Sequence, residues 1–213
     1  MRRGTSFMAT RVYDCLKEIG DKIMANKDFL TDLDREIGDA DHGVNMARGF
    51  AAVVEKVPED ESDIGAALKK TGMTLLSTVG GASGPLYGTA YMEAAKVFAG
   101  KTAVSPEDFK AALEAAIAGI QKRGKAVKGE KTMLDALMPA YDAFSEKVDA
   151  GADLIEALDA ACAAAAEGVE YTKTIAATKG RASYLGQRSV GHQDPGATSA
   201  TMTLESIRDF LKG

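Results

Sequence analysis

Residues 105–120 read SPEDFKAALEAAIAGI, and this stretch carries the clearest helix signal in the chain. Ser105 is suited to cap a helix, Pro106 suits its first turn, and Asp108 stands three residues after the cap. Apolar residues then recur at spacings of three and four, which gives the helix one buried face. They are Phe109, Ala112, Leu113, Ala116, Ile117 and Ile120. The stretch therefore predicts an amphipathic helix that packs against other helices.

The same apolar spacing recurs on both sides of this stretch, so the whole chain is predicted to be helical. No run of β-branched residues alternates with period two, and no sheet is predicted. Short connections between the helices favour antiparallel neighbours. We therefore predict a single all-α domain, an antiparallel eight-helix bundle. Its helices are expected over residues 12–23, 42–57, 62–78, 86–98, 105–120, 132–144, 154–176 and 197–210.

Length and composition limit the classes of protein to which the chain could belong. It has 213 residues, of which 46% are hydrophobic and 27% charged, as in soluble globular domains. A net charge of -5 leaves no basic surplus for nucleic acid, and no apolar run is long enough to cross a membrane. Charged residues from Asp14 onward interrupt any signal peptide, and Cys15 and Cys162 alone cannot form a disulfide scaffold or a cysteine zinc site. We expect a cytoplasmic protein that binds neither nucleic acid nor membranes.

Glycines gather in three polar clusters between the predicted helices. The chain has 22 glycines, a residue that destabilises helix interiors, so their grouping in the gaps indicates functional loops. Both histidines, His42 and His192, lie in these clusters. The clusters are residues 34–45 (DREIGDADHGVN), 79–85 (VGGASGP) and 179–196 (KGRASYLGQRSVGHQDPG).

The first cluster places three carboxylates, those of Asp34, Asp39 and Asp41, just before a predicted helix. Such a dense group of hard oxygen atoms suits Mg²⁺ or Ca²⁺. The alternative is one capping aspartate with solvated neighbours, but a cap needs only one carboxylate. An EF-hand is excluded because Gly43 and Phe50 would occupy positions that require ligands. The cluster predicts a metal site.

The second and third clusters offer groups that suit a phosphate. Backbone N–H groups of residues 80–84, together with Ser83, could approach a phosphate or an adenine, although for this loop taken alone we favour a plain turn between helices. Arg181 could stabilise a transferring phosphoryl group or form a surface ion pair. For His192 we favour a neutral ring that is hydrogen-bonded within its own loop over a phosphohistidine.

A near-match to the nucleotide P-loop occurs at residues 119–126, but Ala126 stands where Ser or Thr would bind Mg²⁺, and the stretch ends a helix instead of following a strand. The basic residues around it could face phosphate, dock an acidic partner, or cover a solvated helix end, and these alternatives stay open. They are Lys122, Arg123, Lys125, Lys128 and Lys131.

Taken in order, GDADHG (38–43), GGASGP (80–85), GK (124–125) with KTM (131–133), and residues 179–196 resemble the ADP-binding L subunits of bacterial phosphoenolpyruvate-dependent dihydroxyacetone kinases. The resemblance spans nearly the whole chain. It implies one nucleotide-binding domain over residues 1–213, with residues 1–7 flexible, that forms an eight-helix barrel holding ADP or ATP at one end.

The resemblance also implies the residues of the site. Asp34, Asp39 and Asp41 would bind two Mg²⁺ ions, and Arg181 would be the catalytic residue. Nucleotide contacts would fall on His42, Gly43, Val44, Asn45, Ala82, Ser83, Gly124, Met133, Arg181, Asp194, Pro195 and Gly196.

In that family the bound ADP is phosphorylated by a phosphohistidine on the M subunit, a protein of the phosphotransferase system. The resulting ATP passes its γ-phosphoryl group to dihydroxyacetone held by the K subunit. Another short ketose, such as erythrulose, or another partner-bound acceptor is the alternative substrate. A nucleotide-sensing adaptor without catalysis is an alternative of a different class, and a transcriptional regulator and a second copy of the chain are further candidate partners.

Overall fold

The computed structural model describes residues 8–9 and 11–213, and within them the chain forms nine α-helices. The flexibility predicted for residues 1–7 concerns residues outside this part. A 3₁₀ segment, η1 (Arg181–Ser189), lies between the last two helices. The helices are α1 (Val12–Ala25), α2 (Lys27–Ile37), α3 (His42–Lys56), α4 (Ile64–Thr78), α5 (Ser83–Val97), α6 (Pro106–Gly124), α7 (Leu134–Asp149), α8 (Leu154–Thr172) and α9 (Pro195–Lys212).

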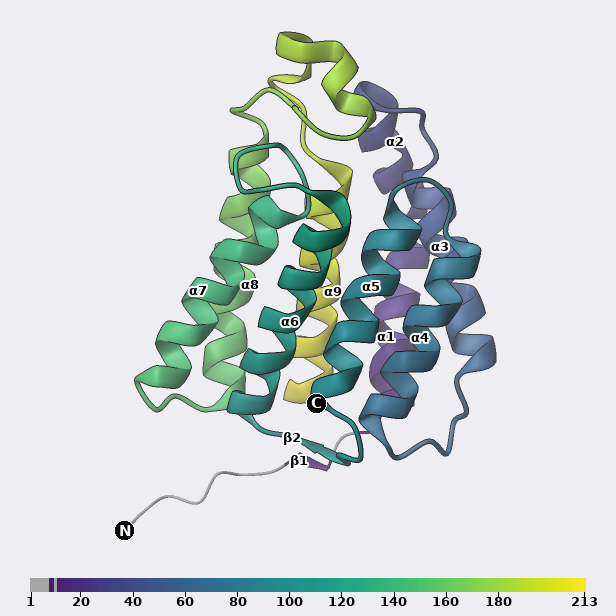
Figure 1. The fold of residues 1–213 in the computed structure, drawn as a ribbon, viewed down its shortest axis with the longest axis vertical. Coiled ribbons are helices and arrows are strands. Elements are labelled where there is room, and N and C mark those ends of the chain that lie inside the picture. The colour runs from purple at the N-terminus through teal and green to yellow at the C-terminus, as the bar shows by residue number, and fades with distance from the viewer. Residues whose placement is uncertain (1–7, 10) are drawn as a thin grey trace.

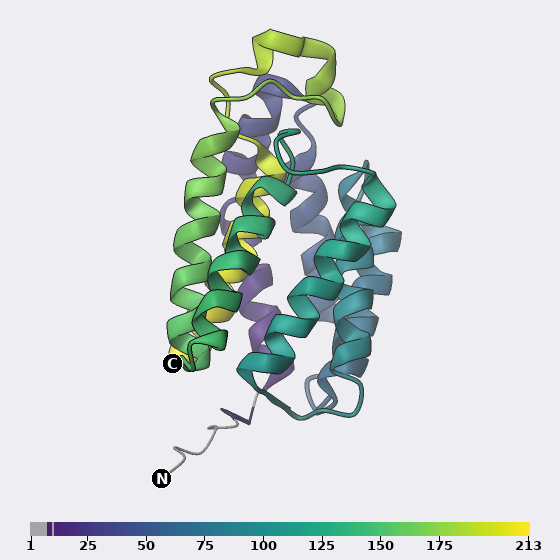
Figure 2. The same ribbon diagram turned by 60° about the vertical axis from the view of Figure 1, so that its left-hand side comes forward.

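Eight of these helices form a closed ring (Figures 1 and 2). Going round the ring, α1 packs against α3, then come α4, α5, α6, α7, α8 and α9, and α9 packs against α1. Neighbours in the ring run antiparallel, because each helix begins at the end of the ring at which the preceding ring helix stops. The all-α, antiparallel eight-helix barrel is therefore confirmed.

Among the nine α-helices of the described residues, α2 alone has no counterpart among the helices predicted from the sequence. It follows α1 after Asn26 alone, and no side chain of Asn26 caps it, so the usual signal for a helix start is absent. Its buried apolar residues are few, because much of it covers the end of the ring beside α3 and α9. The helix matters for function because it carries Asp34 to the end of the ring.

Two short strands add a small exception to the predicted absence of a sheet. Strand β1 (Met8–Ala9) pairs antiparallel with β2 (Ala103–Val104), so that Met8 lies opposite Val104. Strands of two residues are too short to show an alternating pattern in the sequence. The pair lies at the end of the ring that is marked by the C-terminus in Figure 1.

Apolar helix faces fill the interior of the ring, as the spacing of the sequence predicts. In α6, Leu113 and Ile117 are buried, and Phe109 stacks on Phe144 of α7 with ring centroids 5.0 Å apart. The removal of this apolar surface from water is the main force that holds the helices together.

Side chains cap the start of α6, as predicted, and stabilise the start of α7. The Ser105 hydroxyl accepts a hydrogen bond from the N–H of Asp108 at 3.1 Å, as predicted. At α7 the Asp135 carboxylate accepts from the N–H of Thr132 at 2.8 Å, which is one half of a capping box. The other half differs, because the Thr132 hydroxyl accepts from Leu134 instead of Asp135.

The alternation of helix direction decides where the polar clusters meet. The connections 38–41, 79–82, 125–133 and 173–194 all lie at the end of the ring opposite the C-terminus, at the top of Figure 1. These connections contain the three glycine clusters and the basic stretch after α6. Within the described residues, no helix is both long enough and apolar enough to cross a membrane.

Candidate functional site

A cavity of about 390 Å³, here called the site cavity, opens at this end of the ring between the four connections. It brings together most of the site residues predicted from the sequence, although they come from five α-helices (α2, α3, α5, α6 and α9), from η1 and from the connections between these elements. Those that line it are Asp34, Asp39, Asp41, His42, Ala82, Ser83, Gly124, Met133, Arg181, Asp194, Pro195 and Gly196.

Three predicted nucleotide contacts lie beside the site cavity instead of lining it. A Cβ atom on Gly43 would come within 2.0 Å of the Lys27 carbonyl oxygen, so this glycine lets α3 approach α2 closely. Val44 is exposed. Asn45 is buried under the glycine loop, next to Gly80. Their role as nucleotide contacts stays a prediction.

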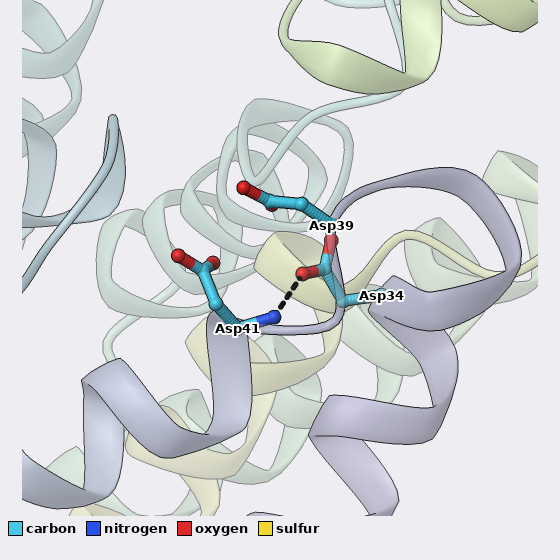
Figure 3. Close-up of side chains that lie close together, drawn as sticks. All are labelled: Asp34, Asp39 and Asp41. Atoms are coloured by element: carbon cyan, nitrogen blue, oxygen red, sulfur yellow. Dashed lines mark hydrogen bonds between the residues drawn. The ribbon is translucent and has the colours of Figure 1, made fainter.

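The three aspartates converge on one point (Figure 3). Each offers a carboxylate oxygen within 4.8 Å of the others, and Figure 3 shows Asp39 and Asp41 projecting on the same side of the loop. Asp34 is buried, and its Oδ2 accepts hydrogen bonds from the N–H groups of Asp41 (2.8 Å) and His42 (3.1 Å). Asp34 thus holds the turn that leads into α3, while Asp39 and Asp41 are free of that task.

The oxygen atoms of this cluster fit a hard divalent cation such as Mg²⁺. Gly38 makes the convergence possible, because a Cβ atom there would lie 2.0 Å from Asp34 Oδ1. The only cation paired with these carboxylates among the described residues is Arg181, whose Nε lies 2.7 Å from Asp39 Oδ2. Arg181 therefore forms an ion pair with a candidate metal ligand that, like Arg181 itself, lines the site cavity.

His42 links the first and second clusters through its ring. Its Nδ1 lies 3.1 Å from Ser83 Oγ, and its Nε2 lies 2.9 Å from Ser199 Oγ in α9. The Tyr87 hydroxyl lies 2.7 Å from the same Ser199 oxygen. Burial lowers the pKa of His42 against the opposing attraction of Asp34 and Asp41, so the ring favours its neutral form. Tyr87 and Ser199 were missed from the sequence because they lie inside helices, outside the glycine clusters.

Lys131, in the basic stretch after α6, is buried and does not belong to a solvated helix end. A solvated helix end is wrong for this residue, because its side chain is only 2% exposed. Its ammonium group donates to the carbonyl oxygens of Thr172 (2.5 Å), Ile175 (3.4 Å) and His192. Burial lowers the pKa of Lys131, although Asp194 attracts its charge. Lys131 thus anchors both ends of the long connection that carries Arg181.

His192 also differs from its prediction. Its ring was expected to bond within its own loop, but Nδ1 lies 3.7 Å from the Glu36 carboxylate of α2. His192 does not line the site cavity. The element that supplies its partner, α2, was not predicted, so the sequence could not indicate this contact.

A sequence model described as the DAK2 domain matches residues 36–209. The chain belongs to the DAK2 domain family. The resemblance found in the motifs is thereby confirmed.

Curated relatives of this DAK2 chain are similar over most of its length. The ADP-binding subunit DhaL of the PEP-dependent dihydroxyacetone kinase of Escherichia coli is 45% identical over 203 residues, which cover 95% of this chain and 97% of that protein. The ADP-binding subunit DhaL of the PTS-dependent kinase of Lactococcus lactis is 40% identical and covers 92% of this chain and 94% of its own. Human triokinase/FMN cyclase is 34% identical over 92% of this chain, which spans 34% of that longer protein.

Solved structures share the fold of this DAK2 chain. The dihydroxyacetone kinase of C. freundii in complex with AMP-PNP and Mg²⁺ superposes with a TM-score of 0.69 over 98% of this chain and 36% of that one. The native form gives a TM-score of 0.71. At 22% identity, this similarity shows that the helical fold is shared.

Asp194 predicts a pH dependence of stability for this DAK2 domain. Its carboxylate caps α9 by accepting from the N–H of Ala197 at 2.6 Å, and burial raises its pKa from 3.8 to about 7. Because the folded pKa lies above the unfolded one, Asp194 favours the folded state at low pH, and this contribution falls as the pH rises from about 4 to about 7.

Asp194→Asn keeps a capping oxygen and removes this titration. Between about pH 5 and about pH 8, the free energy of unfolding of wild type is expected to fall by up to roughly 3 kcal/mol more than that of the variant. Urea unfolding of the ligand-free protein measures this difference. Asp153→Asn is the matched control, because Asp153 caps α8 in the same way but is exposed. Equal pH profiles for wild type and Asp194→Asn would contradict the prediction.

Proposed function

We propose that this chain is the ADP-binding subunit of a phosphoenolpyruvate-dependent dihydroxyacetone kinase, and that it forms one nucleotide-binding domain over residues 1–213. The observation that carries the proposal is the site cavity, in which the three aspartates, the glycine loop at residues 79–85 and Arg181 meet. The similarity to such a subunit supports it, with 45% identity over 97% of that subunit's length. The cavity is of the size that small-molecule ligands occupy.

Two Mg²⁺ ions would be held by Asp34, Asp39 and Asp41. When bound, such ions neutralise the charge of phosphate oxygens and orient them. Asp34 keeps the loop in place through its two N–H bonds, so Asp39 and Asp41 can turn toward a ligand without disturbing α3.

The rest of the site cavity supplies hydrogen-bond donors and an exposed positive charge. Helix α5 begins at Ser83, and among the described residues no side chain caps its N-terminus through a hydrogen bond, so its first N–H groups stay available to an anion. Arg181 is exposed, and its one ion pair within residues 8–9 and 11–213 is with Asp39. When the Asp39 carboxylate binds a metal, the guanidinium would leave it and pair with a phosphate instead. No general base is needed in this chain, because phosphoryl transfer depends mainly on positioning and electrostatics.

The acceptor and the phosphoryl donor would be bound by partner subunits. The polar clusters at this end of the ring are used by the nucleotide site, and a second cavity is lined by apolar side chains such as Leu16, Phe109 and Leu204. A K subunit would hold dihydroxyacetone, and an M subunit with a phosphohistidine would regenerate ATP on this chain. The complex would work in the cytoplasm.

The division of labour is tested by adding the subunits one at a time. The chain alone with ATP, Mg²⁺ and dihydroxyacetone is expected to form almost no dihydroxyacetone phosphate, because the acceptor is not held in a reactive geometry. Adding the K subunit should allow transfer of the phosphoryl group on the bound nucleotide, and adding the M subunit should give sustained turnover. Multiple turnover by the chain alone, or no turnover by all three subunits, would refute the proposal.

A further inference from the structure

Four buried or half-buried side chains form a continuous line of hydrogen bonds from the interior of the ring to the site cavity. The line runs from Tyr87 through Ser199 and His42 to Ser83, with steps of 2.7, 2.9 and 3.1 Å. Tyr87 and His42 also border the site cavity, and Ser83 ends the line at the loop that would face the phosphate in the function proposed above. The direction in which the hydrogens point along this line decides what Ser83 presents to the cavity.

Tyr87 sets the direction at the inner end. Its side chain is 4% exposed, and within the described part of the chain its hydroxyl has Ser199 Oγ as its hydrogen-bond partner. If Ser199 donated to Tyr87, the phenol hydrogen would be left buried without an acceptor, which is costly. Tyr87 is therefore the donor and Ser199 the acceptor in this bond.

Ser199 then has one hydrogen and two candidate acceptors. The Gly196 carbonyl oxygen lies 3.2 Å away, which is longer than the usual range for a hydroxyl–oxygen bond, whereas His42 Nε2 lies at 2.9 Å. The shorter contact favours donation from Ser199 to His42 Nε2. A ring nitrogen that accepts carries no proton, so the proton of the neutral ring lies on Nδ1.

We propose that Tyr87 and Ser199 are positioning residues that hold His42 as the Nδ1–H tautomer, so that His42 donates to Ser83 and the Ser83 hydroxyl is left to donate to an anionic ligand. Ser83 Oγ has no other hydrogen-bond partner among residues 8–9 and 11–213, and it lines the site cavity. The inference rests on the proposed function for the identity of the anion, the phosphate of a nucleotide. The tautomer itself does not depend on it.

The tautomer is measured on the ligand-free wild type by ¹⁵N NMR of the imidazole nitrogens. The chain has 2 histidines, and His192→Gln assigns the signals of His42 without touching the line of hydrogen bonds. Nδ1 is expected to be protonated and Nε2 unprotonated. A proton on Nε2 in the neutral ring overturns the proposal, whatever the protein binds.

Substitutions then test whether the tautomer matters for binding. Ser199→Ala should shift His42 toward the Nε2–H form and weaken ADP binding roughly five-fold, the effect of losing one well-placed donor. Tyr87→Phe should act in the same direction, about two-fold. Ser206→Ala is the matched control, because Ser206 is buried in the same helix and, in the part of the chain that the structure describes, its hydroxyl bonds only to the Met202 carbonyl.

A double-substitution cycle separates this role from a general effect on the fold. In a Ser83→Ala background, Ser199→Ala should change ADP affinity little, because the donor on which it acts is gone. Additive losses, or an unchanged tautomer in Ser199→Ala, would overturn the proposal. Failure of wild type to bind ADP would refute the proposed function instead and leave the NMR result to decide the tautomer.

Discussion

The double variant Asp39→Asn with Asp41→Asn is expected to keep its helical fold and to lose divalent-cation binding together with cation-dependent ADP binding. Changes to groups that only support a metal ligand already weaken metal binding 10–100-fold, so loss of two ligands should cost at least about 100-fold. The fold should survive because neither side chain caps α3 or belongs to the apolar core. Isothermal calorimetry with Mg²⁺ and ADP, and circular dichroism, measure the two parts of this prediction.

The control removes the same charge elsewhere on the surface. Asp21 and Asp32 are exposed and each is paired with one surface cation, so Asp21→Asn with Asp32→Asn should bind Mg²⁺ and ADP as wild type does. Asp34 is not a suitable target, because its carboxylate holds the turn before α3 and its loss would mix structural and binding effects. Full ADP retention in the Asp39 and Asp41 double variant would refute the metal site.

Arg181→Ala is expected to keep ADP and Mg²⁺ but to slow phosphoryl transfer in the reconstituted kinase by up to about 10³-fold. The ion pair with Asp39 gives the reason for retained metal binding: without Arg181, the metal no longer competes with a guanidinium for that carboxylate. Mg²⁺ affinity should therefore stay the same or rise. Single-turnover rates and calorimetry on the same preparation measure the two effects separately.

Two further variants show whether the effect belongs to the guanidinium of Arg181. Arg188→Ala removes an exposed arginine from the same 3₁₀ segment and should leave the rate near that of wild type. Arg181→Lys keeps the charge without the planar fork and should recover only part of the rate. If Arg181→Ala lost ADP while its bound fraction reacted at the normal rate, Arg181 would be a contact of the ground state.

The sequence predicted best where structure depends on nearby residues. The helix at 105–120 was found with its cap, because both the apolar spacing and the Ser105 bond to Asp108 involve residues a few positions apart. Helix α2 was missed for the same reason, since it lacks a local start signal. The motifs with Asp39 and Arg181 indicated a phosphate site, but their spacing could not show that these two side chains touch.

What the sequence by itself determined is thus the all-α class, most helices, the DAK2 motifs and the residue types from which the site is built. Only the tertiary structure decided which of them meet. The closed ring brings four connections to one end, Arg181 to Asp39, and Ser199 to His42 across 157 positions of the chain. It also buries Lys131, which the sequence alone left open as a solvated residue. The physical reason is that apolar periodicity and capping are set within one or two helical turns, whereas the partner of a polar side chain depends on the direction and packing of helices far away in sequence.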